Sequence, residues 1–253
     1  MVSLATRVEL GTMPTAPGSK DPYAGVYALA DRFGLTSAQA LKLRRYAALL
    51  AEDERAPTTV RDPQRVIDDH LADALVALSF PAVRQASGAA DIGAGAGVPG
   101  VILAVALPGT HVTLIEGSTR KCDFLRAVAG ALELENLTVV HTRAEAWEPG
   151  LGCMDLVTAR AVAPLQVVCE YAAPLLKLGG ALLAWRGRRD PEAERAASIA
   201  CEVLGLTPSE PLRVHPYAGA EHRHLHLVTK TRQTPSRFPR RPGMAAKRPL
   251  GDT

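Results

Sequence analysis

Apolar and polar residues alternate along the first third of the chain at the spacing of amphipathic helices. The pattern predicts three helices, at residues 22–34, 38–52 and 63–79. Ser37 is placed to cap the second helix, and Asp62 to cap the third, which has Pro63 at its first helical position. Because all three precede the first convincing strand, we expect a helical cap over residues 21–86, after a flexible N-terminus at residues 1–20.

From residue 88 onward, short strand-forming runs alternate with helical patterns. Strands are predicted at residues 89–92, 111–115, 137–141, 155–159 and 180–185, and helices at residues 99–107, 119–132, 164–176 and 191–204. This alternation implies right-handed crossovers and a parallel sheet with helices on both faces. Two more strands, at residues 212–215 and 225–229, predict an antiparallel hairpin at the sheet edge. We therefore expect an α/β, Rossmann-like, mostly parallel sheet of seven strands over residues 87–230.

The last segment, residues 231–253, loses all periodicity and forms a basic, Pro-rich C-terminal tail. The chain as a whole has a net charge of +3, but its basic residues gather at this end. Residues 213–253 hold nine Lys or Arg and only two acids. A basic end on a nearly neutral body favours a polyanionic partner such as nucleic acid, although a merely solubilising tail explains the charge equally well.

Composition narrows the class of protein further. Hydrophobic residues make up 47% of the chain, yet no apolar run approaches the roughly 20 residues of a membrane span. The N-terminus has no signal-peptide pattern, so we expect a cytoplasmic protein without a membrane partner. The four cysteines form no CxxC pair, which predicts buried free thiols and no metal site. No long apolar surface helix indicates an obligate dimer, and we expect a monomer.

A glycine-rich loop provides the first chemical signal. The segment Asp-Ile-Gly-Ala-Gly-Ala-Gly, residues 91–97, lies between the first predicted strand of the sheet and the following helix. Glycines let the backbone turn sharply and approach a ligand closely, and the helix presents its positive N-terminus to that ligand. Pro99 fits the first turn of this helix.

Two cofactors compete for this loop. Gly95, Gly97 and Gly100 satisfy the dinucleotide pattern GxGxxG, which is a weak signal alone. However, Asp91 opens the loop with an acid that would repel a pyrophosphate and that suits the cationic ammonium of S-adenosylmethionine. Glu116, at the end of the second strand, can accept hydrogen bonds from ribose hydroxyls of either cofactor. Asp91 therefore favours S-adenosylmethionine, while a dinucleotide or a purely structural turn stays possible.

Several segments together carry a wider resemblance. They are residues 91–100, 116–121, 124–125, 61–63, 70–75, 142–145, 158–163, 221–225, 238–243 and 247–250. On these residues the chain resembles the bacterial small-subunit rRNA guanine-N7 methyltransferase family, also called the glucose-inhibited division protein B family, over roughly residues 20–250. The loop at Arg160 and the Arg-Arg-Pro-Gly at residues 240–243 are the most specific matches. The chain departs from the family at residues 57–59, which read Pro-Thr-Thr instead of Asn-Leu-Thr, and at Arg186, where the family has Lys.

The resemblance implies transfer of a methyl group from S-adenosylmethionine to N7 of guanine 527 of 16S rRNA, free or in the 30S subunit. It implies cofactor contacts at Gly93, Gly95, Val98, Glu116, Gly117, Ser118, Ala144, Glu145 and Arg160. Three of these have plainer interpretations from the residues alone. Val98 can simply pack the helix start, Glu145 can favour a helix dipole, and Arg160 can pair with a structural carboxylate.

The implied chemistry needs no general base, because guanine N7 has a free lone pair and no proton. We therefore assign no catalytic residue, and Arg160 is a candidate for positioning the guanine or the donor's carboxylate. The expected contacts to RNA phosphates are Arg186, Arg188, Arg223, Arg240, Arg241 and Lys247. Two alternatives stay open: a methyltransferase for another RNA, a protein or a small molecule, and a non-catalytic nucleic-acid-binding protein.

Overall fold

A computed structural model describes residues 21–251, so the expected flexibility of residues 1–20 lies outside the described residues. The helices are α1 (Gly25–Arg32), α2 (Ser37–Glu52), α3 (Pro63–Val66), α4 (Asp73–Leu75), α5 (Pro81–Arg84), α6 (Gly100–Ala106), α7 (Thr119–Ala131), α8 (Leu165–Ala172), α9 (Pro191–Leu204) and α10 (Met244–Lys247). A π-helical turn and three 3-10 turns are η1 (Ile67–Ala72), η2 (Val76–Ser79), η3 (Ala144–Ala146) and η4 (Glu148–Gly150). The strands are β1 (Gly88–Ile92), β2 (His111–Glu116), β3 (Leu137–His141), β4 (Met154–Arg160), β5 (Leu176–Arg186), β6 (Leu206–Pro208), β7 (Leu212–Arg213) and β8 (His224–Lys230).

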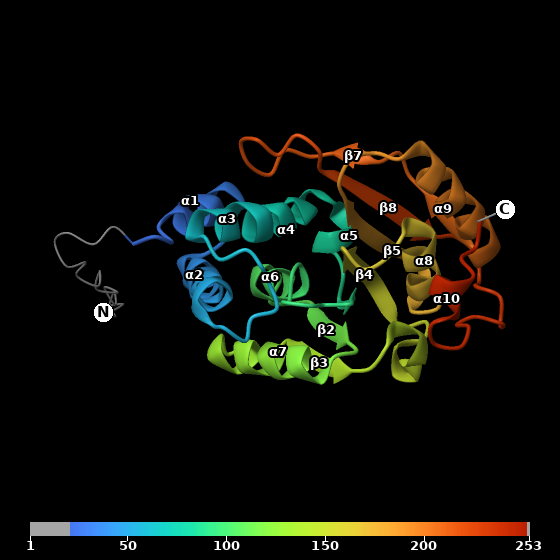
Figure 1. Cartoon of the computed structure of the whole chain (residues 1–253), viewed down its shortest axis with the longest axis horizontal. Helices are drawn as coiled ribbons and strands as arrows, with labels where there is room; N and C mark the ends of the chain where they lie inside the picture. The colour runs from blue at the N-terminus through green and yellow to red at the C-terminus, as the bar shows by residue number, and fades with distance from the viewer. Residues whose placement is uncertain (1–20, 252–253) are drawn as a thin grey trace, which may run out of the picture.

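One sheet organises the protein, in the order β3-β2-β1-β4-β5-β8-β6, with β7 paired to β8 (Figure 1). The first five of these strands are parallel, and β8 runs antiparallel to β5, β6 and β7. The mostly parallel α/β sheet and its antiparallel end are therefore confirmed. The predicted number of seven strands is wrong, because the sheet has eight. The missed strand, β6, follows directly on Gly205, the residue that caps α9. At three residues it is too short to show alternation.

Most predicted boundaries agree with the structure to within a few residues, and the exceptions have local causes. The helix expected over residues 164–176 ends at Ala172, because Pro174 lacks the N–H that a continuing helix needs, and β5 begins soon afterwards. The expected cap Ser37 is instead the first residue of α2. Thr36 is the cap: its hydroxyl accepts the Gln39 N–H at 3.3 Å, and the Gln39 amide oxygen accepts the Thr36 N–H at 2.8 Å.

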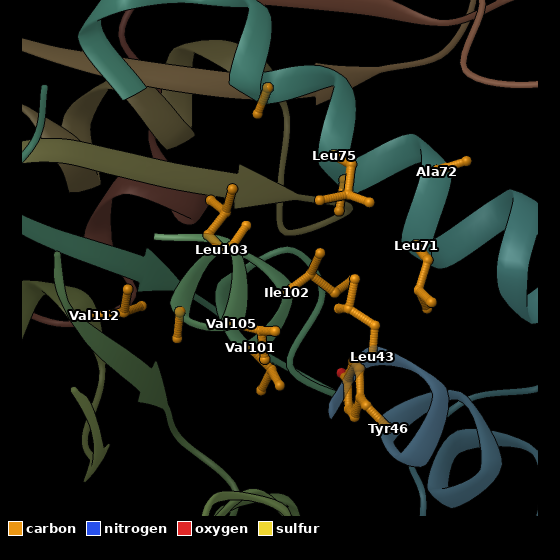
Figure 2. Close-up of a cluster of buried hydrophobic side chains, with 14 of the residues drawn as sticks. Leu43, Tyr46, Leu71, Ala72, Leu75, Val101, Ile102, Leu103, Val105 and Val112 are labelled. Atoms are coloured by element: carbon orange, nitrogen blue, oxygen red, sulfur yellow. The ribbon is translucent and has the colours of Figure 1, made fainter. Parts of the chain in front are cut away.

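The N-terminal helices share a hydrophobic core with the sheet. Every residue of α6 is buried, because the helix lies between the sheet and the N-terminal helices. Figure 2 shows Leu43 and Tyr46 of α2 and Leu75 of α4 pointing toward Ile102 of α6. Burying such side chains contributes roughly 1.5–3 kcal/mol each. The helices that precede the sheet are thus built into the same core as the glycine loop that begins α6.

The opposite face of the sheet is covered by α8 and α9, which lie on the other side of it in Figure 1. The segment from residue 231 to residue 251 is largely irregular, but it does not extend away from the protein. Phe238 is buried in the core beneath α8 and α9, and Leu250 packs against the same cluster. Within residues 21–251, no helix is long and apolar enough to cross a membrane.

Candidate active site at the carboxyl edge of the sheet

The glycine loop occupies the turn between β1 and α6, as predicted, and two of its glycines are required by geometry. Gly93 has φ +65° and Gly97 has φ +96°, a region that L side chains rarely adopt. A Cβ on Gly93 would lie 2.9 Å from the Val162 side chain. On Gly97 it would lie 2.9 Å from the Tyr46 hydroxyl, which donates to the Ala96 carbonyl at 2.7 Å. The loop therefore tolerates no side chain at either position.

Asp91 lies beneath this loop. Its Oδ2 accepts the Gly100 N–H at 3.0 Å, and its Oδ1 accepts the Thr158 hydroxyl at 2.8 Å. Burial raises the pKa of the Asp91 carboxyl to about 7, against the lowering effect of those two hydrogen bonds. With 1% exposure, Asp91 braces β1, β4 and the start of α6, and its expected contact with the donor's ammonium stays a prediction.

The start of α6 differs from expectation. Pro99 is the residue before the first helical residue and does not lie within the first turn. Gly100 is that first residue, and a Cβ there would lie 2.3 Å from Leu114 of β2. The helix therefore rests directly on the neighbouring strand, which is the packing role of the last glycine in such loops.

Glu116 ends β2 beside the loop and is oriented by two backbone amides. Its Oε2 accepts the Gly95 N–H at 3.0 Å, and its Oε1 accepts the Ser118 N–H at 2.9 Å. Each carboxylate oxygen keeps a further lone pair. Gly95 and Ser118, two residues predicted to contact the cofactor, are thus brought together around the buried carboxylate of Glu116.

A pocket of about 160 Å³, here called the donor pocket, opens where β1, β2, β3 and β4 end. It is lined by Ile92, Gly93, Ile115, Gly117, Thr142, Arg143, Ala144, Glu145, Val162 and Tyr171. Four predicted residues, Gly93, Gly117, Ala144 and Glu145, therefore converge on one cavity. Val98 does not line it and packs against the hydrophobic core, which is the plainer of its two interpretations. Tyr171 of α8 was not predicted.

Glu145 has an unexpected partner from the end of the chain. Its Oε1 accepts the backbone N–H of Gly243 at 2.9 Å, although the two residues are 98 positions apart. Gly243 has φ +83° and precedes α10. The C-terminal segment therefore supports the wall of the donor pocket.

Arg160, at the end of β4, lies at the centre of a buried polar cluster. Its Nη1 donates to Asp73 Oδ2 and to the Asp69 carbonyl, both at 2.8 Å, and its Nη2 donates to His70 Nδ1 at 3.0 Å. Burial, together with the Arg160 charge, lowers the pKa of His70 to about 4. His70 is therefore neutral near pH 7, and its Nε2–H donates to the Thr58 hydroxyl at 3.0 Å. The pairing of Arg160 with a carboxylate, one of the two interpretations left open, is present.

A second pocket of about 300 Å³, here called the acceptor pocket, begins at Arg160. It is lined by Asp73, Arg160, Ala161, Trp185, Arg186, Gly187, Arg188 and Arg223. The two pockets adjoin along the chain, because Ala161 lines the acceptor pocket and the next residue, Val162, lines the donor pocket. Ala161 has φ +55°, so the backbone turns sharply between them.

The family of this chain follows from comparison with known proteins. A family model described as GidB, rRNA small subunit methyltransferase G, matches residues 39–225. A protein named ribosomal RNA small subunit methyltransferase G from Rubrobacter xylanophilus is 40% identical over 215 residues, which cover 82% of each chain. The chain belongs to this family. A relative of the same name from Chloroflexus aggregans is 42% identical over 198 residues, covering 76% of this chain and 82% of the relative.

Solved structures of other methyltransferases are similar to this chain in fold. A SAM-dependent methyltransferase from Aquifex aeolicus is similar with a TM-score of 0.54 at 16% identity, over 67% of this chain and 94% of that one. A precorrin-6y C5,15-methyltransferase from Geobacter metallireducens has a TM-score of 0.50 at 16% identity, over 72% and 96%. At these identities the likeness shows the class I methyltransferase fold alone.

Three of the six residues predicted to contact RNA line the acceptor pocket: Arg186, Arg188 and Arg223. The other three lie in the C-terminal segment, outside the pocket. Arg240 donates from Nε to Glu170 at 2.6 Å, and Glu170 is only 3% exposed, so Arg240 anchors the segment to α8. Arg241 and Lys247 have exposed side chains.

The four cysteines are free thiols, and three of them are buried. Residues 21–251 contain no cluster of three or more His, Cys, Asp or Glu that could hold a metal ion. Cys122, Cys169 and Cys201 are buried free thiols, as predicted, whereas Cys153 is exposed, contrary to expectation. Its place between η4 and β4, in a turn, explains the exposure.

Proposed function

We propose that this chain transfers a methyl group from S-adenosylmethionine to N7 of guanine 527 of 16S rRNA, in conventional numbering. The observation that carries the proposal is the junction of two pockets at residues 160–162. One pocket has the glycine loop and Glu116 beside it, and the other is lined by four arginines. The name shared by the curated relatives supports the same activity.

The residues present fit the methyl donor. Gly93 lines the donor pocket without a side chain of its own, and Glu116 is held by two amides with lone pairs left for ribose hydroxyls. Gly117 and Ala144 leave room in the donor pocket for a flat base. When bound, S-adenosylmethionine supplies an electrophilic methyl group on a sulfonium.

The residues of the chain then position the acceptor. Guanine N7 attacks through its in-plane lone pair, and no proton has to be removed before or during the attack. Among the described residues that line the acceptor pocket, the only carboxylate is Asp73, which is already paired with Arg160. Orientation of the two reactants can therefore supply the catalysis, because effective molarities in well-oriented reactions are large enough to make this sufficient.

The arginines supply electrostatic attraction for the RNA backbone. Arg186, Arg188 and Arg223 line the acceptor pocket. Neutralising phosphates releases counterions, so binding weakens as salt rises. We further propose that 16S rRNA or the 30S subunit is the partner, and that the protein acts as a cytoplasmic monomer. An acceptor that is another RNA, a protein or a small molecule is the second candidate.

The test is to incubate the protein with methyl-labelled S-adenosylmethionine and 30S subunits or 16S rRNA that lack the modification, and to map the label. Label at N7 of guanine 527 supports the proposal, and label at any other nucleotide, or none on RNA, refutes it.

A matched pair of variants, Gly93→Ala and Gly130→Ala, tests the donor pocket. The first should weaken donor affinity at least about tenfold, because of its positive φ and the contact with Val162. A Cβ on Gly130 would have no neighbour within 4 Å, so Gly130→Ala should bind the donor as tightly as the wild-type protein does.

A further inference from the structure

Asp73 of α4 contributes a carboxylate that the protein itself does not fully satisfy. The side chain is 5% exposed and lines the acceptor pocket. Its Oδ2 accepts from Arg160, but its Oδ1 has no hydrogen-bond partner among the described residues. Arg223 Nε lies 3.4 Å from Oδ1 and forms an ion pair with it without a hydrogen bond. A buried oxygen without a donor is uncommon and costly, so a ligand that brings a donor to Asp73 would be favoured.

The polar groups around Asp73 define which ligand edge would fit. The other charged side chains of the pocket are arginines, which only donate hydrogen bonds, so Asp73 is the one side-chain carboxylate there. The Watson–Crick edge of guanine presents two donors, N1–H and the exocyclic amino group, next to one acceptor, O6. Adenine presents an acceptor at N1 instead. A carboxylate beside a guanidinium therefore complements guanine and opposes adenine.

The placement of Asp73 also agrees with methylation at N7. N7 lies on the opposite side of the purine from N1 and the amino group, so a base with N7 toward the donor pocket directs its Watson–Crick edge away from it. Arg160 contacts Asp73 on one side, while Val162, two residues later, lines the donor pocket. Enzymes that modify bases extrude the target nucleotide and recognise it by this edge.

We propose that Asp73 reads the Watson–Crick edge of the acceptor guanine and sets the base specificity of the enzyme. Its carboxylate accepts the N1–H and the exocyclic amino group, while Arg160 holds the carboxylate in place. This inference rests on the proposed function, because it requires a guanine acceptor. Asp73 is a specificity-determining residue in this proposal and takes no part in bond making.

The test compares guanosine with inosine at position 527 of reconstituted 30S subunits. Inosine keeps N7 but lacks the exocyclic amino group that Asp73 would bind. For the wild-type protein, kcat/KM should be at least about tenfold higher with guanosine, as for a hydrogen bond to a buried charge. In Asp73→Asn the ratio should fall toward unity, because the amide offers one acceptor oxygen in place of two. Asp68→Asn is the matched control on the same helical run, outside the pocket, and should keep the wild-type ratio.

Each outcome decides the inference. Equal wild-type rates on both nucleosides overturn it while the proposed function stands, and this measurement does not depend on whether a variant folds. An equal loss on both nucleosides in Asp73→Asn would assign Asp73 only the role of counter-ion to Arg160. Failure of the wild-type protein to methylate guanosine 527 at all would refute the proposed function itself, and the inference with it. Donor affinity and thermal melting of Asp73→Asn check that the variant is folded.

Discussion

Replacing Asp91 by Asn tests how the glycine loop is braced. The variant has nearly the same shape: its amide oxygen can still accept the Gly100 N–H, and the Thr158 hydroxyl can turn to accept from the amide nitrogen. What the substitution removes is a buried group that titrates. Burial raises the pKa of this carboxyl from 3.8 to about 7, so the folded state binds its proton more tightly than the unfolded chain does.

The sign and size of the effect follow from linkage. A raised pKa contributes stability that is complete below about pH 4 and is lost as the pH rises through about 7. A rise from 3.8 to about 7 corresponds to about 4 kcal/mol, at about 1.4 kcal/mol for each tenfold change in the proton-binding constant. Between about pH 4 and pH 8 the wild-type protein should therefore lose up to about 4 kcal/mol of stability relative to Asp91→Asn.

The assay is urea denaturation of both proteins at several pH values, with the difference in their free energies of unfolding as the readout. All other titrating groups are common to both proteins and cancel in this difference. A difference that stays constant from about pH 4 to about pH 8 would refute the reasoning, because Asp91 would then keep one protonation state throughout. With saturating S-adenosylmethionine, the positive donor should favour the ionised carboxylate and reduce the pH dependence.

Two further pairs of variants test contacts of the C-terminal segment and of α2. Arg240→Gln should destabilise the protein by about 3 kcal/mol in urea denaturation, because it leaves the buried Glu170 carboxylate without its cation. Its neighbour Arg241→Gln should leave stability unchanged but weaken RNA binding and reduce its salt dependence, and equal effects of the two variants would contradict the assigned roles. Tyr46→Phe should cost about 1 kcal/mol, since a carbonyl of the glycine loop loses its donor, whereas Tyr27→Phe, at an exposed residue of α1, should cost nothing measurable.

The sequence alone predicts the fold well because the strands are separated by strong helical patterns. The bounds of β3 and α9 agree residue for residue with the prediction. Gly93 and Gly117 could be placed in one cavity, since the ends of neighbouring parallel strands meet at one edge of the sheet. These are local properties, in which a turn or a strand end determines where the residue lies.

Long-range contacts and the facing of side chains could not be predicted in the same way. The hydrogen bonds that Asp91 accepts from Gly100 and Thr158 could not be predicted, because the direction of a side chain at a strand end depends on the elements packed against it. Tyr171 enters the donor pocket from α8, and Gly243 reaches Glu145 across 98 positions. Asp73 did leave a signal, as an acid flanked by apolar residues on both sides, but only the structure shows which pocket it lines.

The contact between Gly243 and Glu145 has a consequence for the order in which the protein is made. Translation delivers the glycine loop and every strand of the sheet before the residues that hold the wall of the donor pocket. The first helices, in contrast, are available early to support the same loop from the other side through Tyr46. The core shared by the first helices and the glycine loop can therefore form before the donor pocket is complete, because the wall of the pocket needs Gly243.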